Sequence, residues 1–165
     1  MLGTMAQRGR EKRLDALEFR AWRAFLYASA LIVPRLDQEL TSAEGLTLNQ
    51  YEVLMWLRRA GKRGLRMSDL ASKVVLSPSG VTRAVDQLER KGLVERCLFE
   101  GDKRGQVATL TPKGRTVLRR ATSVQVRWIR EHFLQHLTRS QLEHLATGSE
   151  AILEGEGSSP LPTAS

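Results

Sequence analysis

The chain has 165 residues, of which 41% are hydrophobic and 27% are charged, so it can bury a core as one domain or as two small ones. It has no apolar run long enough for a membrane span or a signal peptide. Its one cysteine excludes an internal disulfide and a four-cysteine metal site, which favours a cytoplasmic setting. Lysine and arginine number 26 against 18 acids, and this net charge of +8 favours a polyanionic partner such as nucleic acid.

Residues 1–13 are small, polar and basic and predict a flexible arm. From Leu14 to Leu40, apolar residues recur at helical spacing, which predicts one long amphipathic helix. Pro34 lies inside this segment and predicts a kink, because proline lacks an N–H group and crowds the carbonyl group of Ala30. The apolar stripe consists of Leu14, Leu17, Trp22, Phe25, Leu26, Ile32, Val33, Leu36 and Leu40.

A second helix is predicted to begin at a capping box formed by Thr47 and Gln50, with Leu46 and Tyr51 as a hydrophobic staple. It is apolar on nearly every side through Leu57, which predicts burial, and the glycine-bounded residues 61–64 end it. A short helix follows, with Ser68 as its N-cap and with these side chains pointing inward: Leu70, Ala71, Val74 and Val75.

The next helix is predicted to begin after Ser77 as N-cap, with Pro78 at the first helical position, and to end at Gly92 as the C′ residue. One of its faces is apolar and predicted to be buried: Val81, Ala84, Val85 and Leu88. The other face is polar and basic, with short side chains near the N-terminus: Ser79, Thr82, Arg83, Asp86 and Arg90.

Residues 93–99 and 106–110 have the pattern of two strands, joined by a loop that carries adjacent cations. Strand alternation predicts that Cys97 lies on an apolar face with Leu93 and Phe99, as a small buried side chain. Thr111 and Pro112 begin a long helix to about Leu137, and a capping box at Thr138 and Gln141 begins the last helix. From Gly148 the tail is rich in glycine, serine and proline and is expected to fray.

This order of elements predicts a mainly α fold with a minor β part: a winged helix-turn-helix lobe with long terminal helices. The second helix of such a pair fits the DNA major groove, and the hairpin reaches the backbone or the minor groove, where a narrow groove attracts arginine. The apolar stripes of the terminal helices need a partner. A second copy is the simplest one, and the alternative is that these helices cover their own lobe. The expected parts are the arm 1–13, a dimerisation helix and linker 14–46, the lobe 47–111, C-terminal helices 112–153 that complete the dimer, and a disordered tail 154–165.

Several stretches of the lobe resemble the MarR family of bacterial transcription regulators: Leu65–Ala71, Leu76–Arg83, Leu88–Arg96, Gly101–Gly105 and Leu110–Gly114. The resemblance implies a homodimer with interlocked terminal helices and two winged lobes on a pseudo-palindromic operator. It also implies release by a small ligand bound between the dimer helices and each lobe. The family's wing usually has the sequence Asp-Arg-Arg. Here it is Asp102-Lys103-Arg104, so the middle position stays cationic.

The candidate DNA contacts lie on the helix pair and the hairpin: Ser68, Ser77, Ser79, Thr82, Arg83, Arg90, Lys103 and Arg104. The alternative is a solvated face with ordinary helix capping. Asp102 gains nothing by facing phosphate, so we expect it to orient a neighbouring arginine of the wing. The candidate pocket for a small aromatic or anionic effector, which is alternatively plain core, consists of Trp22, Phe25, Tyr51, Met55, Trp56 and Arg115.

His132 and His136 have a spacing that suits zinc, but no third ligand is in evidence, so no metal site is predicted. No phosphate loop, nucleophile elbow or catalytic triad is present, so we expect no catalytic residue and no cofactor apart from a small-molecule effector. The sequence thus predicts a cytoplasmic, nucleoid-associated regulator, a ligand-responsive repressor that binds double-stranded DNA as a homodimer. A protein-contact module and a sequence-neutral architectural DNA binder remain as alternatives, and the residues do not distinguish repression from activation.

Overall fold

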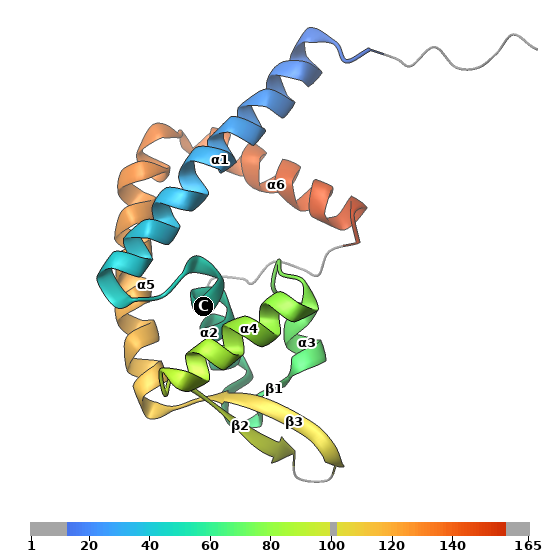
Figure 1. Cartoon of the computed structure of the whole chain (residues 1–165). Coiled ribbons are helices and arrows are strands. Elements are labelled where there is room, and N and C mark those ends of the chain that lie inside the picture. The colour runs from blue at the N-terminus through green and yellow to red at the C-terminus, as the bar shows by residue number, and fades with distance from the viewer. Residues whose placement is uncertain (1–12, 100–101, 158–165) are drawn as a thin grey trace, which may run out of the picture. The chain divides into compact units, whose positions relative to one another are not determined.

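The computed structural model describes residues 13–99 and 102–157, without the side chains of residues 98–99 and 102–106. It divides at Pro34 into two units, Met1–Pro34 and Arg35–Ser165. Helix α1 (Ala16–Glu44) contributes to both units and continues through Pro34 (Figure 1). Asp15 caps it, accepting hydrogen bonds from the N–H groups of Leu17 and Glu18 at 2.7 and 2.8 Å. The predicted arm lies outside the described residues apart from Arg13.

The first unit exposes its apolar side chains. Between Leu14 and Val33, nine large hydrophobic residues are from 43% to 64% exposed. On α1 only Leu36 and Leu40, which belong to the second unit, are buried. The predicted apolar stripe is therefore present on the helix, but most of it is uncovered in the single chain.

The second unit is built around helix α2 (Leu48–Ala60), which begins as predicted. Thr47 and Gln50 form the capping box, and both members of the predicted staple, Leu46 and Tyr51, are buried. Gly61, with a φ of 63°, ends the helix and leads into the 3₁₀ turn η1 (Gly61–Arg63). The largest fully buried side chains of the core are Leu40, Leu46, Val53, Leu54, Leu57, Leu70, Val81, Val85, Leu88, Val94 and Leu118.

The segment after η1 corrects two predictions. Strand β1 (Leu65–Arg66) pairs with a later strand, so its backbone is extended, and helix α3 (Met67–Ala71) begins two residues earlier than predicted. Its N-cap is therefore Arg66, and Ser68 lies inside the first turn. Val74 is buried, but Val75 is 96% exposed, because the helix ends at Ala71 and helical periodicity no longer directs the side chains that follow.

Helix α4 (Pro78–Arg90) follows the prediction closely. Ser77 caps it, its four predicted apolar residues are all buried, and Gly92 has the predicted positive φ, 68°. The N–H groups of Gly92 and Leu93 donate to the carbonyl groups of Glu89 and Leu88 at 2.8 and 2.9 Å, so these carbonyl groups at the end of the helix have hydrogen-bond partners.

Strands β2 (Val94–Phe99) and β3 (Asp102–Leu110) form an antiparallel hairpin. Strand β1 pairs with β3, so the order in the sheet is β1-β3-β2 (Figure 1). Strand β3 begins four residues before the predicted boundary. The prediction of a buried Cys97 was wrong: the thiol is exposed. Cys97 lies opposite Val107 and shares its strand face with Glu95, whereas Leu93 precedes the strand and is buried.

Helix α5 (Pro112–His132) begins as predicted, with Thr111 as its cap, and it ends before the 3₁₀ turn η2 (Leu134–His136). Gly114 packs so tightly on the backbone of Leu93 that an added Cβ would overlap its carbonyl oxygen. Helix α6 (Arg139–Gly155) has the predicted capping box, but it continues through Gly148 instead of fraying there. Residues 158–165 of the predicted tail lie outside the described residues. No helix among the described residues is long and apolar enough to cross a membrane.

Candidate nucleic-acid interface

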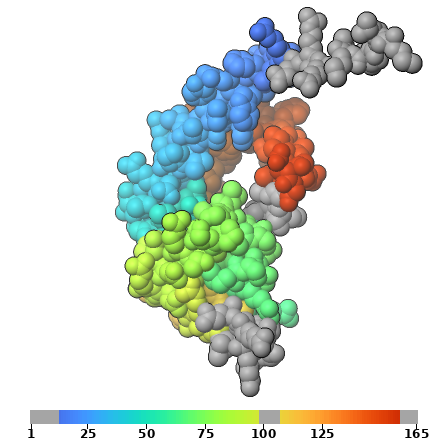
Figure 2. All heavy atoms as spheres, turned by 45° about the vertical axis from the view of Figure 1, so that its right-hand side comes forward, coloured from blue at the N-terminus to red at the C-terminus, as the bar shows by residue number. Residues whose placement is uncertain are grey.

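The exposed face of α4 carries the polar residues that the sequence assigned to DNA. Ser77, Ser79, Thr82, Arg83 and Arg90 are all exposed, while the opposite apolar face is buried in the lobe. The green surfaces of α3 and α4 are continuous in the space-filling view of Figure 2. Burial of one face thus fixes which side of the helix is presented to a partner.

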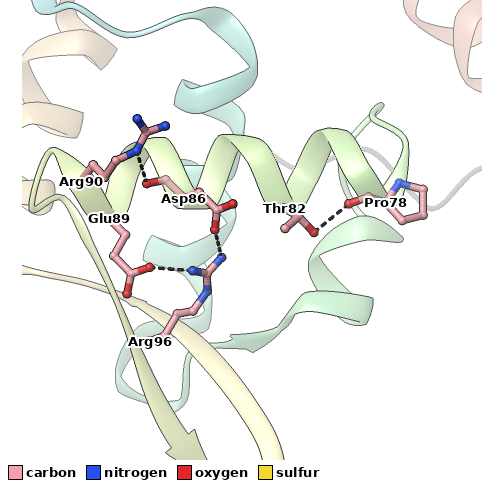
Figure 3. Close-up of polar contacts among 6 residues, drawn as sticks. All are labelled: Pro78, Thr82, Asp86, Glu89, Arg90 and Arg96. Carbon is pink, nitrogen blue, oxygen red and sulfur yellow. Dashed lines mark hydrogen bonds and ion pairs between the residues drawn. The ribbon is translucent and has the colours of Figure 1, made fainter.

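The first turn of α4 is stabilised by its own hydroxyl groups. Ser77 Oγ accepts from the Gly80 N–H at 3.2 Å and lies 3.1 Å from Ser79 Oγ. Thr82 Oγ1 donates to the carbonyl group of Pro78 at 3.1 Å (Figure 3). These side chains are short, so a duplex can approach the start of the helix closely.

The two arginines of this face differ in setting. Arg83, one turn into the helix, has no ion-pair partner among the described residues, so its planar guanidinium is available for a phosphate or a guanine. Arg90 lies about 10 Å further along the helix, and its Nε donates to the carbonyl group of Asp86 at 3.4 Å (Figure 3). Arg83 is therefore better placed than Arg90 for a contact made by the start of the helix.

Arg96 of β2 is a residue that the sequence analysis missed. Its guanidinium contacts Asp86 Oδ1 at 2.5 Å and Glu89 Oε2 at 2.6 Å, so it joins the hairpin to α4 (Figure 3). The side chain of Arg96 is 21% exposed. Its single positive charge offsets one of the two negative charges that Asp86 and Glu89 place on the helix proposed to meet a polyanion. Two acids one turn apart, followed by a cation in the next strand, were the available signal.

The remaining predicted DNA contacts lie on α3 and on the hairpin. Ser68 is exposed in the first turn of α3, with its Oγ 3.4 Å from Asp69 Oδ1. The backbone of Asp102, Lys103 and Arg104 belongs to β3, but their side chains lie outside the described part of the chain, so their roles stay predictions. The fully exposed Val75 precedes α4 and adds an apolar side chain near this surface.

The predicted effector residues are only partly brought together. Tyr51, Met55 and Trp56 lie on α2, and the hydroxyl group of Tyr51 is 3.3 Å from Thr122 Oγ1. Burial raises the pKa of Tyr51. Trp56 is half-buried, with Lys73 Nζ 4.9 Å from its ring centroid.

The other three predicted effector residues lie elsewhere. Trp22 and Phe25 belong to the first unit, where their ring centroids are 6.4 Å apart. Arg115 lies on α5 and donates to the carbonyl group of Leu110 at 2.8 Å, in a groove that Tyr51, Met55 and Trp56 do not line.

The histidines considered for zinc have other neighbours. The ring of His132 stacks on Trp128 with centroids 4.6 Å apart, and its Nδ1 lies 3.1 Å from the Trp128 carbonyl oxygen. Within residues 13–99 and 102–157, no group of three or more histidine, cysteine, aspartate and glutamate side chains is arranged to hold a metal.

Comparison with known proteins shows which protein family the chain resembles. Residues 44–105 match a model described as the MarR family. Sco3205 of Streptomyces coelicolor, a MarR family transcriptional regulator solved in complex with DNA, is 34% identical; the match covers 90% of this chain and 95% of that one, with a TM-score of 0.82. AbsC, a MarR family transcriptional regulator of the same organism, is 32% identical, with coverages of 88% and 98% and a TM-score of 0.81.

A curated relative, the transcriptional activatory protein BadR of Rhodopseudomonas palustris, is 33% identical over 93 residues, which is 56% of this chain and 53% of that protein. The chain spans about half the length of the curated relatives it matches.

Proposed function

Because the chain belongs to the MarR family of transcriptional regulators, we propose that it is a ligand-responsive repressor that binds a pseudo-palindromic operator as a homodimer. Helix α4 enters the major groove, and the basic wing contacts the backbone or the minor groove. The observation that carries this proposal is the exposed start of α4. Thr82 and Arg83 are exposed there, Arg83 has no ion-pair partner among the described residues, and the opposite face of the helix is apolar and buried. Its relatives are regulators and not enzymes.

The charge of the protein supports a DNA partner. The net charge of +8 favours phosphate, and Arg96 bonds both carboxylates of α4 and offsets one of their two negative charges. A protein that acts on the chromosome works at the nucleoid, so we expect it in the cytoplasm.

The uncovered apolar surface supports the homodimer. The first unit exposes side chains such as Trp22, Phe25 and Leu31, and α6 contains no buried residue while exposing Leu145 and Ile152. Monomeric proteins rarely expose large apolar patches, so we expect each of these helices to be covered by a partner. A second copy that covers these helices also spaces two α4 helices for two half-sites.

Ligand response is proposed for the half-buried side of α2. Met55 and Trp56 are neither core nor fully exposed, and a half-buried aromatic with cations nearby suits an aromatic or anionic effector. The effector would release DNA by favouring a dimer state in which the two α4 helices no longer fit their half-sites.

A mobility-shift titration tests the proposal. DNA upstream of the protein's own gene is compared with a scrambled duplex at rising salt, and we expect tight, selective binding with a log–log salt slope of roughly −0.9 for each phosphate contact. Equal affinity for both duplexes would support an architectural DNA binder, and no binding to either would support a protein-contact module. A promoter–reporter measurement with the gene deleted then distinguishes repression from activation, which is the role of the relative BadR, a transcriptional activatory protein.

A further inference from the structure

A groove of about 700 Å³ lies on the face of the sheet that is turned away from α4, and we call it the outer-sheet groove. Arg96 packs on α4 from one face of β2, so its neighbours Glu95 and Cys97 point to the opposite face. The walls are η1 on one side and the first turn of α5 on the other. The groove is therefore separate from the exposed face of α4 and from Tyr51, Met55 and Trp56.

The charge of the outer-sheet groove is strongly positive. Lys62 and Arg63 of η1 and Arg115 of α5 line it, against a single acid, Glu95. Glu95 accepts a hydrogen bond from Thr109 Oγ1 at 3.3 Å. Lys62 and Arg63 have no ion-pair partner within the described ranges 13–99 and 102–157, and the N-terminus of α5 adds partial positive charge. Three cations beside one acid leave the groove with a net positive charge, which attracts an anion.

The floor of the groove is apolar. Val107 and Leu110 are each 6% exposed, and Pro112 and the Cys97 thiol lie beside them. A volume of this size suits an organic molecule, and an apolar floor with a few convergent polar groups is the usual composition of a small-molecule site. A phosphate of the DNA backbone would use the cations but not the recessed floor.

We propose that the outer-sheet groove binds a small organic carboxylate, with its charged group at Lys62, Arg63 and Arg115 and its apolar body on Val107 and Leu110. The site is additional to the effector pocket proposed on α2.

Cys97 is the only cysteine of the chain and lines the groove, so its alkylation reports occupancy directly. The probe is 2-naphthoate, the neutral control is 2-naphthamide, and the reagent is iodoacetamide, all with the full chain and without DNA. At about ten times its Kd, measured by calorimetry, 2-naphthoate leaves about a tenth of the sites free, so alkylation slows roughly tenfold. The amide should protect little.

Variants that remove one cation, either inside or outside the groove, test the role of charge. Lys62→Ala and Arg63→Ala, both on exposed side chains, should each raise the Kd of 2-naphthoate roughly threefold to tenfold. Arg119→Ala, an exposed cation of α5 that does not line the groove, should leave the Kd unchanged.

Three results overturn the proposal. The first is equal protection by the amide. The second is absence of protection at millimolar 2-naphthoate. The third comes from a separate labelling with a DNA duplex in place of the carboxylate: protection by the duplex alone assigns the cations to the DNA backbone. Because the labelling with 2-naphthoate uses no DNA, absence of protection by 2-naphthoate leaves the proposed regulatory function intact, and failure of operator binding leaves the 2-naphthoate result intact.

Discussion

Gln50 of α2 donates a hydrogen bond from its Nε2 to Oε1 of Gln87 on α4, at 2.6 Å. Gln50 is the one buried polar residue among those the structure describes, at 3% exposure. Its Oε1 accepts from Lys91 Nζ at 3.0 Å, and Lys91 also donates to the carbonyl group of Gly45 at 2.6 Å. A directional contact thus joins the proposed recognition helix to the start of α2, in addition to non-directional apolar packing.

Replacing Gln50 should destabilise the lobe. Gln50→Ala removes the capping-box side chain and the partner of Gln87, and we expect a loss of about 1–3 kcal/mol in the free energy of unfolding, measured in urea. Gln38→Ala, on an exposed side chain of α1, is the control and should change stability by less than about 0.5 kcal/mol. Equal effects of the two variants would contradict a structural role for the Gln50–Gln87 contact.

Arg83 and Arg104 should affect DNA binding differently. If Arg83 contacts a base edge, Arg83→Ala should weaken operator binding by about 1–3 kcal/mol and relax preference at one base pair. Arg104→Ala at the wing should weaken every sequence, most where an A/T-rich minor groove flanks the site, and Arg104→Lys should restore general affinity better than groove preference. The measurement is a binding panel on base-substituted operators. The reverse pattern would exchange the roles of helix and wing, and no effect of either variant would exclude residues 77–104 as the DNA surface.

Arg96 should act on DNA binding through α4 instead of by contact. Arg96→Ala leaves Asp86 and Glu89 without their shared cation, so the net charge of this cluster on the helix proposed to meet phosphate changes from −1 to −2. We expect lower operator affinity, and about 1 kcal/mol or less of lost stability because the carboxylates are 46% and 39% exposed. Adding Asp86→Asn and Glu89→Gln to Arg96→Ala should recover part of the affinity. No recovery would show that the position of the hairpin, and not charge, is the role of Arg96.

The exposed apolar helices should pair two chains. Light scattering at micromolar concentration should give twice the 18.5 kDa mass of one chain. Footprints should show two half-sites about 10 base pairs apart. A stable folded monomer would contradict the dimer and would require another partner for side chains such as Leu31 and Ile152.

Glu52 of α2 should make stability depend on pH in an identifiable direction. Burial raises the pKa of Glu52 above its ordinary value of 4.5, and Arg59 opposes this only in part. A raised pKa means that folding favours the protonated carboxyl, so the cost of the charged form is present at neutral pH and is relieved as the pH falls through the folded pKa. Glu52→Gln should therefore stabilise the protein by about 1 kcal/mol or less at pH 7. The advantage should shrink on acidification. A constant difference between the two proteins from pH 7 to pH 3 would exclude this cause.

Four of the predicted helix caps were correct from the sequence alone. Thr47, Ser77, Thr111 and Thr138 each cap a helix through an N–H group three residues later, so each start is decided within one turn of chain. The buried face of α4 likewise follows from 3.6-residue periodicity, which needs no knowledge of the partner element. These four helix starts and the polar face of α4 are therefore properties that the amino-acid sequence determines by itself.

Tertiary structure determined the features that depend on strand pairing and on contacts between distant segments. Cys97 is exposed on the strand face that it shares with Glu95, and Ser68 is not a cap because β1 pairs with β3 and sets the start of α3. Arg96 reaches Asp86 and Glu89 across ten and seven residues of chain, which is farther than capping or helical periodicity acts. The outer-sheet groove is assembled from η1, two strands and α5, and its charge exists only once those segments meet. Capping and periodicity act within one turn, whereas register and packing join segments that the sequence separates, and only the folded chain determines which ones meet.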